Sequence, residues 1–342
     1  MRIAMLRRWM PTAIKVALVG LIVYFIAANV PLKLADIETF LVEANVQFYT
    51  SMVVFAFFLM LQAAIWVMIV NASNEGVGGL RSGARLGLLA GLRIFSDSQF
   101  AKYIPGGFWN FAGRVMLTTR AGIALDAQLA AIVYENILLV SAALCYAVVL
   151  LVSLDIAPAV YIIAVLAVFA AAYVFYDRTT AWIRWLFVRA SRWKTLRRVL
   201  GRLTAALGQE IGAEAAVAGS EAGLTRNRFF GSLACFIGSH MFMGIAFWML
   251  TNSFGRGHVG LFYAAGTFAT SWLVGLFSPL PGGLGVREGL LVYFLSLRLG
   301  AETALYISVI ARLWNMMAEV MFWAAVRAAA YLTRRGRTYD EA

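Results

Sequence analysis

The chain alternates between long apolar runs and shorter polar segments. Apolar runs of about 20 residues are long enough for a helix to cross the hydrocarbon core of a bilayer. Seven runs are predicted to form spans, at 13–30, 48–71, 127–153, 157–176, 229–251, 259–278 and 303–331. The pattern therefore predicts an all-α polytopic membrane protein, with residues 1–342 forming a single transmembrane domain.

Two segments rich in proline and glycine interrupt this pattern. The first, SDSQFAKYIPGGFWNFAGRV (96–115), lies between apolar runs too short to span, so it predicts a re-entrant hairpin with its tip near Pro105–Gly107. The second, SPLPGGLGVREG (278–289), precedes a helix from Leu284 to Arg298 that rises only about 22 Å, short of the ~30 Å core. Irregular backbone at that depth is tolerated only where protein or a water-filled cavity surrounds it. We therefore expect a broken helix over about 281–298 that faces a polar interior.

Positive charges orient the predicted spans. Arg2, Arg7 and Arg8 place the N-terminus in the cytoplasm. The loop from Asp177 to Arg228 carries ten Lys or Arg residues and is predicted to be cytoplasmic as well. Three arginines, 334, 335 and 337, place the C-terminus on the same side. Seven spans would leave the C-terminus outside, so the broken helix is needed as an eighth crossing.

Composition narrows the class of protein. Apolar residues make up 62% of the chain and charged residues 13%, far from the roughly 25% charged residues of soluble domains. The net charge of +12 lies mostly in loops between spans, as topology requires, so no nucleic-acid partner is expected. Cys145 and Cys235 are predicted to be buried structural thiols, and two histidines without ligand spacing predict neither a metal site nor a cofactor.

The basic loop 177–228 contains an apolar stripe at helical spacing: Leu196, Val199, Leu200, Leu203 and Leu207. Two interpretations stay open, an amphipathic helix on the anionic leaflet or a solvated connector.

Ionisable groups inside the predicted membrane region are the candidate site. Each costs about 2.5–3.5 kcal/mol on insertion scales and needs a partner or a water-filled cavity. The candidate substrate-binding residues are Tyr103, Arg114, Glu135, Arg287, Glu288, Arg312, Asn315 and Glu319.

Spacing predicts how these groups pair. Arg312, Asn315 and Glu319 share one helix face, but Arg312 and Glu319 are about 10 Å apart by helical rise, too far to satisfy each other. We expect Arg287 to meet Glu319 and Arg114 to meet Glu135. Whether the pairs only tie helices together or bind substrate or protons is left open.

His240, Lys102 and Tyr103 have interpretations that do not involve these ion pairs. His240 is predicted to be a packing residue bonded to a neighbour, whereas Lys102 and Tyr103 either snorkel to the membrane surface or touch a headgroup. No nucleophile–base arrangement and no phosphate-loop spacing is present, so no catalytic residue is predicted and the protein is not expected to be an enzyme.

The two glycine motifs share more than their tripeptide. Pro105 and Pro281 are 176 residues apart, each is followed by an arginine, and each precedes a span with a glutamate. Paired interruptions of this kind point to a transport site between repeats. The halves would be 1–176 and 229–342, and duplication and independent origin stay open.

The motifs YIPGGFWNFAGR and PLPGGLGVREG resemble the lysylphosphatidylglycerol synthase transmembrane family over about Thr12 to Leu332. The resemblance implies a helical membrane domain with re-entrant segments that moves or handles lipids with polar headgroups. It maps the family pattern onto Tyr103, Pro105, Gly106 and Arg114, and onto Pro281, Gly282, Gly283, Gly285, Arg287 and Glu288. The soluble domain that transfers the amino acid has no room in this chain, so synthesis of aminoacyl lipids is not expected.

The expected function is a flippase that moves an anionic or polar-headgroup lipid across the bacterial inner membrane. The alternative is a non-transporting scaffold for a lipid- or glycan-modifying enzyme, with loop 177–228 as its docking surface. An enzyme acting on a lipid phosphate is a third and weaker interpretation. The expected partners are membrane lipids with anionic headgroups, and a homo-oligomer or a lipid-modifying enzyme partner is left open.

Overall fold

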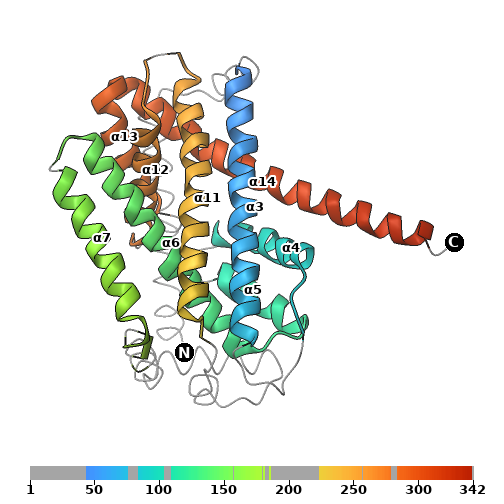
Figure 1. Cartoon of the computed structure of the whole chain (residues 1–342). Coiled ribbons are helices and arrows are strands. Elements are labelled where there is room, and N and C mark those ends of the chain that lie inside the picture. The colour runs from blue at the N-terminus through green and yellow to red at the C-terminus, as the bar shows by residue number, and fades with distance from the viewer. Residues whose placement is uncertain are drawn as a thin grey trace, which may run out of the picture.

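The structure is a computed structural model that describes residues 44–75, 84–103, 109–156, 158–178, 180–181, 185, 223–255, 257–278 and 283–340. Within these ranges all regular structure is helical (Figure 1), so the predicted all-α class is confirmed. The helices are α3 (Val46–Glu75), α4 (Leu88–Gln99), the 3-10 helix η1 (Phe100–Tyr103), α5 (Trp109–Arg120), α6 (Leu125–Ser153), α7 (Pro158–Val174), α11 (Arg226–Asn252), α12 (Leu261–Leu276), α13 (Val286–Leu299) and α14 (Ala301–Asp340).

Four of these helices are long and apolar enough to cross a membrane: α3, α6, α11 and the Ala301–Thr333 part of α14. They match four predicted spans, and the protein is a multi-pass membrane protein. The spans predicted at 157–176 and 259–278 correspond to the shorter helices α7 and α12. The span predicted at 13–30 and the stripe 196–207 lie outside the described residues.

An antiparallel pair of long helices, α3 and α11, forms the centre of the bundle (Figure 1). The amide of Gln62 donates a hydrogen bond to Ser239 Oγ in the middle of the pair. At one end Asn45, just before α3, donates to the carbonyl of Ser253, just after α11. We name this the upper end, and the opposite end, where α3 finishes and α11 begins, the lower end.

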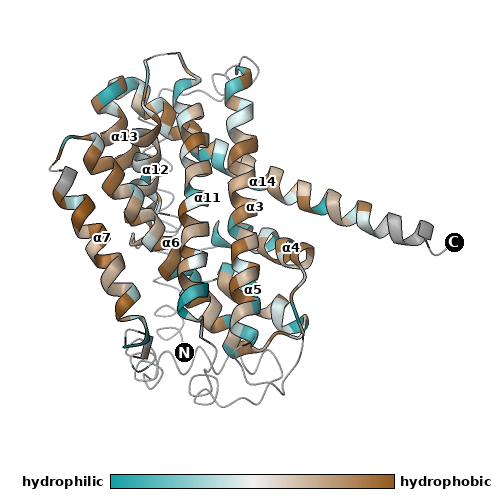
Figure 2. Ribbon diagram, in the orientation of Figure 1, coloured by the Kyte–Doolittle hydropathy of each residue, from teal (hydrophilic) through white to brown (hydrophobic). Residues whose placement is uncertain are grey.

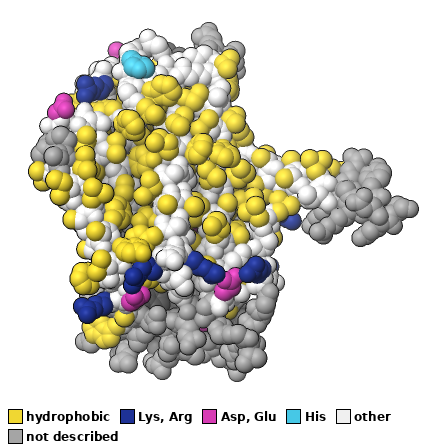
Figure 3. Space-filling model, in the orientation of Figure 1, with side chains coloured by type: hydrophobic (Ala, Val, Ile, Leu, Met, Phe, Trp, Pro, Cys, Tyr) yellow, Lys and Arg dark blue, Asp and Glu magenta, His cyan; other side chains and the backbone are white. Residues whose placement is uncertain are grey.

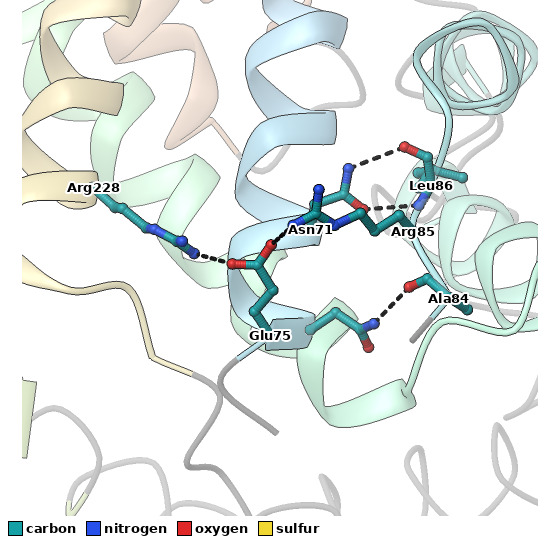
Figure 4. Close-up of polar contacts among 7 residues, drawn as sticks. Asn71, Glu75, Ala84, Arg85, Leu86 and Arg228 are labelled. Carbon is teal, nitrogen blue, oxygen red and sulfur yellow. Dashed lines mark hydrogen bonds and ion pairs between the residues drawn. The ribbon is translucent and has the colours of Figure 1, made fainter. Parts of the chain in front are cut away.

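A first short hairpin, α4–η1 followed by α5, enters from the lower end. Asn71 on α3 binds both the N–H and the carbonyl of Leu86, and Asn74 binds the carbonyl of Ala84 (Figure 4). Glu75 adds ion pairs to Arg85 and Arg228, at 2.6 and 2.7 Å. These contacts satisfy the backbone where it enters the hairpin and fix the hairpin to α3 and α11.

A second hairpin, α12–α13, opens at the upper end. Its two helices are antiparallel, because the Tyr263 hydroxyl donates to the carbonyl of Phe294 near the upper end. At the far end Gly283 approaches Gly275 so closely that a Cβ on Gly283 would lie 2.9 Å from the Gly275 carbonyl oxygen. The chain therefore returns to the end from which it came, and α14 starts there. The helix α13, Val286–Leu299, lies where the sequence predicts the helical part of the broken crossing.

The outer surface suits a lipid environment. Apolar side chains cover the faces of α3, α7 and α11 in Figures 2 and 3, and charged groups gather along the lower edge of the apolar band. Most of the large apolar side chains described on α7 are exposed. The helix α14 extends beyond the bundle (Figure 1).

One prediction about burial is wrong. Cys145 is half-buried, but Cys235 is exposed on α11. An apolar run indicates a helix in the membrane, but it does not tell which side faces lipid, because the lipid-facing and protein-facing sides are both apolar.

Candidate functional site

The polar stripe on α14 lies inside the bundle. The amide of Asn315 donates to Glu319 Oε1 at 2.5 Å, and both residues are buried. A carboxylate placed there by an apolar helix needs compensating charge because lipid and apolar side chains provide none.

That charge comes from the first hairpin. Lys102 on η1 lies with its Nζ 2.5 Å from Glu319 Oε1, a contact between residues 217 positions apart. The Glu319 side chain is 1% exposed and the Lys102 side chain 32% exposed, so the ion pair has a buried end and an accessible end.

A second ion pair joins α13 to α14. Arg312 Nη1 lies 3.2 Å from Glu288 Oε1. The other carboxylate oxygen of Glu288 accepts the N–H of Gly285 at 2.7 Å, which caps the start of α13. Glu288 therefore has a structural role in addition to its contact with Arg312.

Arg287 completes the group. Its guanidinium lies over the ring of Phe268 on α12, 4.7 Å from the ring centroid. Arg287 and Arg312 lie within electrostatic range of Lys102. We call Lys102, Arg287, Glu288, Arg312 and Glu319 the charged cluster.

The charged cluster is assembled from η1, α13 and α14. Among the residues that the structure describes, it contains three cations and two carboxylates. Three cations gathered from three elements are suited to contacts with an anion, and arginine offers the planar geometry that phosphate accepts.

Contacts beside the charged cluster hold α4 on α14. Asp97 accepts two hydrogen bonds from Arg327, at 2.7 and 2.9 Å, and one from the Trp323 indole at 3.0 Å. The rings of Phe100 and Trp323 also meet edge to face. The first hairpin thus contacts α14 along two turns below Glu319.

A separate ion pair joins α5 to α6. Arg114 Nη1 lies 2.8 Å from both carboxylate oxygens of Glu135, so the predicted pair forms. Their side chains are 5% and 8% exposed. The guanidinium also lies over the rings of Trp66, Phe95 and Phe111, while its Nε has no hydrogen-bond partner.

The predicted site residues thus fall into two groups. Arg287, Glu288, Arg312, Asn315 and Glu319 come together, and Arg114 with Glu135 forms its own pair. The predicted contact between Arg287 and Glu319 stays a prediction, since the contacts described for Glu319 are with Lys102 and Asn315.

Only part of the two glycine motifs belongs to the described residues. Gly283 and Gly285 have φ angles of +69° and +81°, which glycine adopts without strain. Residues 105–107, 281 and 282 and the side chain of Tyr103 lie outside the described residues.

Sequence reasoning missed two roles. Lys102 was expected to snorkel or to touch a headgroup, but it pairs with Glu319, and Asp97 was not considered. Both lie on one short segment five residues apart, and a polar stripe on that segment was the available signal. The predicted packing role of His240 agrees with its contact to the Phe236 carbonyl and its stacking on Tyr146.

Groups of three or more His, Cys, Asp or Glu side chains that could hold a metal ion do not occur among the described residues. The side chains gathered in the charged cluster offer charge recognition by Lys, Arg and Glu.

Comparison with known proteins agrees with the geometry. Residues 12–318 match the family described as the lysylphosphatidylglycerol synthase TM region. No curated protein matches the chain significantly. Because the match covers most of its length, the chain belongs to the lysylphosphatidylglycerol synthase transmembrane-region family.

Proposed function

We propose that this protein is a flippase that moves a lipid with an anionic or polar headgroup across the bacterial inner membrane. The observation that carries the proposal is the charged cluster, which gathers five ionisable side chains from three elements inside a membrane bundle. Placing each charge there costs about 2.5–3.5 kcal/mol on insertion scales, so intramembrane charges are functional candidates by default. Membership of a family named for a lipid-related membrane region supports the same conclusion.

The order of helices supports a two-repeat organisation. A long helix, a short helix, a glycine motif, a short helix and a long helix occur in α3–α6 and again in α11–α14. The leading helices α3 and α11 are antiparallel, and the hairpins open at opposite ends (Figure 1). We infer that the halves are inverted repeats, an arrangement that transporters use to alternate access around a central site.

In this proposal both hairpins are re-entrant. Ala265 of α12 packs on Gly244 of α11, eight residues before that helix ends. Gly275 then lies about 27 Å from the upper end along α11, which is about 40 Å long, so the second tip stays within the bilayer. Together with the crossing expected at 13–30, the chain would then cross the bilayer six times, through 13–30, α3, α6, α7, α11 and α14, instead of the eight times expected from the sequence.

The lower end is assigned to the cytoplasm. Arg85, Arg226 and Arg228 lie there, and the basic loop 177–228 connects there as well. Both termini are then cytoplasmic.

Transport would use the charged cluster as an exchange site. A lipid phosphate can take the place of Glu319 as the partner of Lys102 and bind Arg287 and Arg312, while its acyl chains stay in the bilayer. Release restores the ion pair between Lys102 and Glu319. The lipid is not changed chemically, so no enzymatic activity is proposed.

Exchange of lipids between leaflets tests the proposal. The full chain is reconstituted into liposomes that contain fluorescent anionic, zwitterionic or isoprenoid-phosphate lipids, and leaflet exchange is measured for wild type and Glu319→Gln. Glu75→Gln is the matched control, because it removes a carboxylate with two ion pairs at the lower end, away from the charged cluster. Exchange that Glu319→Gln abolishes and Glu75→Gln retains supports the proposal. Equal exchange by all three proteins, or no exchange of any lipid by wild type, contradicts it.

A further inference from the structure

Two asparagines make the same contact at opposite ends of the bundle. The Asn71 amide donates to the carbonyl of Leu86 at 3.0 Å, and its oxygen accepts the N–H of Leu86 at 2.8 Å. The Asn252 amide donates to the carbonyl of Val259 at 3.0 Å, and its oxygen accepts the N–H of Val259 at 2.8 Å. We call the first contact the lower clamp and the second the upper clamp.

The clamps occupy equivalent places in the two hairpins. Leu86 and Val259 each lie two residues before a short helix, α4 or α12, and a glycine with extended backbone follows each of them. The asparagine precedes its partner by fifteen residues in the lower clamp and by seven in the upper clamp. Because connections of such different length end in the same contact, the contact belongs to the design of the hairpins and not to the turns that lead into them.

An aromatic pair accompanies each clamp. Nine residues after the clamped residue, Phe95 packs on Trp66 of α3 and Phe268 packs on Phe247 of α11, with ring centroids 5.8 and 4.8 Å apart. Trp66 and Phe247 each lie five residues before the asparagine of the clamp. The clamp and the aromatic pair together fix each short helix on its leading helix.

An arginine follows at the same spacing in both hairpins. Arg114 and Arg287 each lie 28 residues after the clamped residue. Each guanidinium lies 4.7 Å from the centroid of the phenylalanine ring on the short helix, Phe95 or Phe268. The clamps therefore set the register of two equivalent arginines, of which Arg287 belongs to the charged cluster.

The hairpins lie on opposite sides of the charged cluster. Lys102 comes from the end of the α4–η1 arm, and Arg287 and Glu288 come from the start of α13. With both hairpins re-entrant, as proposed above, the first hairpin lies between the charged cluster and the lower end, and the second lies between the charged cluster and the upper end. Access from one end then requires the hairpin on that side to leave its leading helix.

We propose that each clamp keeps one side of the charged cluster closed. Asn71 closes the lower side and Asn252 the upper side, and the two clamps release their hairpins in turn during transport. Both asparagines are positioning residues, since they act on the charged cluster through the hairpins. The inference rests on the proposed function, because it names the residues that control access to the same site.

Thiol labelling from each side of the membrane tests the clamps. Ser98 and Ser271 are buried and each lies twelve residues after the clamped residue, so Ser98→Cys and Ser271→Cys place equivalent probes in the two hairpins. Cys145→Ala and Cys235→Ala remove the two native thiols. A membrane-impermeant maleimide is added to vesicles of either orientation that contain the full chain, and the rate of labelling is measured.

Each alanine variant should open one side. Asn71→Ala removes the two hydrogen bonds of the lower clamp, so labelling of Ser98→Cys from the lower side should rise about tenfold, while labelling of Ser271→Cys from the upper side stays the same. Asn252→Ala should give the reverse result. Asn71→Asp and Asn252→Asp keep the acceptor and lose the donor, so a smaller rise is expected on the same side as for alanine. If an alanine variant does not fold, the aspartate variants decide the test.

Asn136→Ala on α6 is the matched control, because Asn136 donates to the carbonyl of Ile132 within its own helix. It should change neither rate. A general loosening of the bundle has no preferred side, so equal rises from both sides overturn the proposal, as does the absence of a rise in the clamp variants. Labelling confined to the expected side, in a protein whose wild type exchanges no lipid, would refute the proposed function and leave the clamps intact.

Discussion

Two sets of buried charges can be compared within this one membrane bundle. Arg114 and Glu135 form a closed pair, in which one guanidinium nitrogen meets both carboxylate oxygens and aromatic rings cover the cation. The charged cluster is open, because it draws on three elements and includes a Lys102 side chain that is partly exposed. One set is neutral in itself, and the other is suited to a further anion.

The difference indicates what each set does. A buried pair whose two charges neutralise each other stabilises the packing of α5 on α6, both in the first half of the chain. The contact between Lys102 and Glu319 joins η1 in the first half to α14 in the second, so its rupture would remove one of the contacts that hold the first hairpin on α14. We therefore expect substitutions in the closed pair to affect folding most and substitutions in the charged cluster to affect transport most.

Glu135→Ala should have the largest effect on stability. The substitution leaves the Arg114 guanidinium buried without its carboxylate, which costs about 3–5 kcal/mol in buried pairs of proteins. Chemical unfolding of the purified chain in micelles would measure the loss.

A double substitution serves as its control. Arg114→Met with Glu135→Leu removes both charges and fills the same space, so it should recover most of the lost stability. If the double variant is as unstable as Glu135→Ala, the pair has a role beyond mutual neutralisation and the comparison fails.

Glu319→Gln should show the opposite behaviour. The amide keeps the contact to Lys102 but loses its charge, and charge-assisted hydrogen bonds contribute about 1.5–3 kcal/mol. If the pair must re-form in each transport cycle, leaflet exchange should fall about ten- to a hundredfold. The loss of stability on unfolding in micelles should be smaller than the ~3–5 kcal/mol expected for Glu135→Ala, since the Lys102 side chain is 32% exposed and less confined than that of Arg114.

The sequence predicted the parts of this comparison that depend on local pattern. Apolar runs identified α3, α6, α11 and α14, and helical spacing placed Arg312, Asn315 and Glu319 on one face. Arg114 and Glu135 could be paired because only a short turn separates their helices.

Long-range contacts could not be predicted in this way. Lys102 and Glu319 are 217 residues apart, and nothing in the periodicity of either segment indicates that η1 packs on α14. The ring contact of Arg287 with Phe268 likewise depends on how α12 folds back against α13. Exposure of Cys235 was missed because hydropathy does not distinguish helix faces inside a bilayer.

Gly283→Ala should have an intermediate effect. With φ at +69° an L-residue costs about 1–2 kcal/mol, and the new methyl would lie 2.9 Å from the carbonyl oxygen of Gly275. The tip of the second hairpin must then shift, which should lower both stability and exchange. Gly289→Ala is the matched control, because its methyl would meet no atom within 4 Å and it lies in a helix, where alanine is favoured. Equal stability of the two variants would show that the close approach of Gly275 and Gly283 is dispensable.

Asp97→Asn should have the smallest effect. It tests whether the ion pair of Lys102 with Glu319 matters for its charge or only because it holds the first hairpin on α14. The ion pair with Arg327 is partly exposed and should contribute about 0.2–1 kcal/mol, while an asparagine can still accept the Trp323 hydrogen bond. The first hairpin therefore stays on α14, and exchange should fall less than about threefold. The two measurements are leaflet exchange and unfolding, each compared with Glu319→Gln. If Asp97→Asn stops exchange as fully as Glu319→Gln does, the contacts between the first hairpin and α14 matter only because they hold the hairpin in place, and the charge of Glu319 has no separate role. Glu319 would then belong with the closed pair of Arg114 and Glu135, and the distinction between the two sets of charges would be lost.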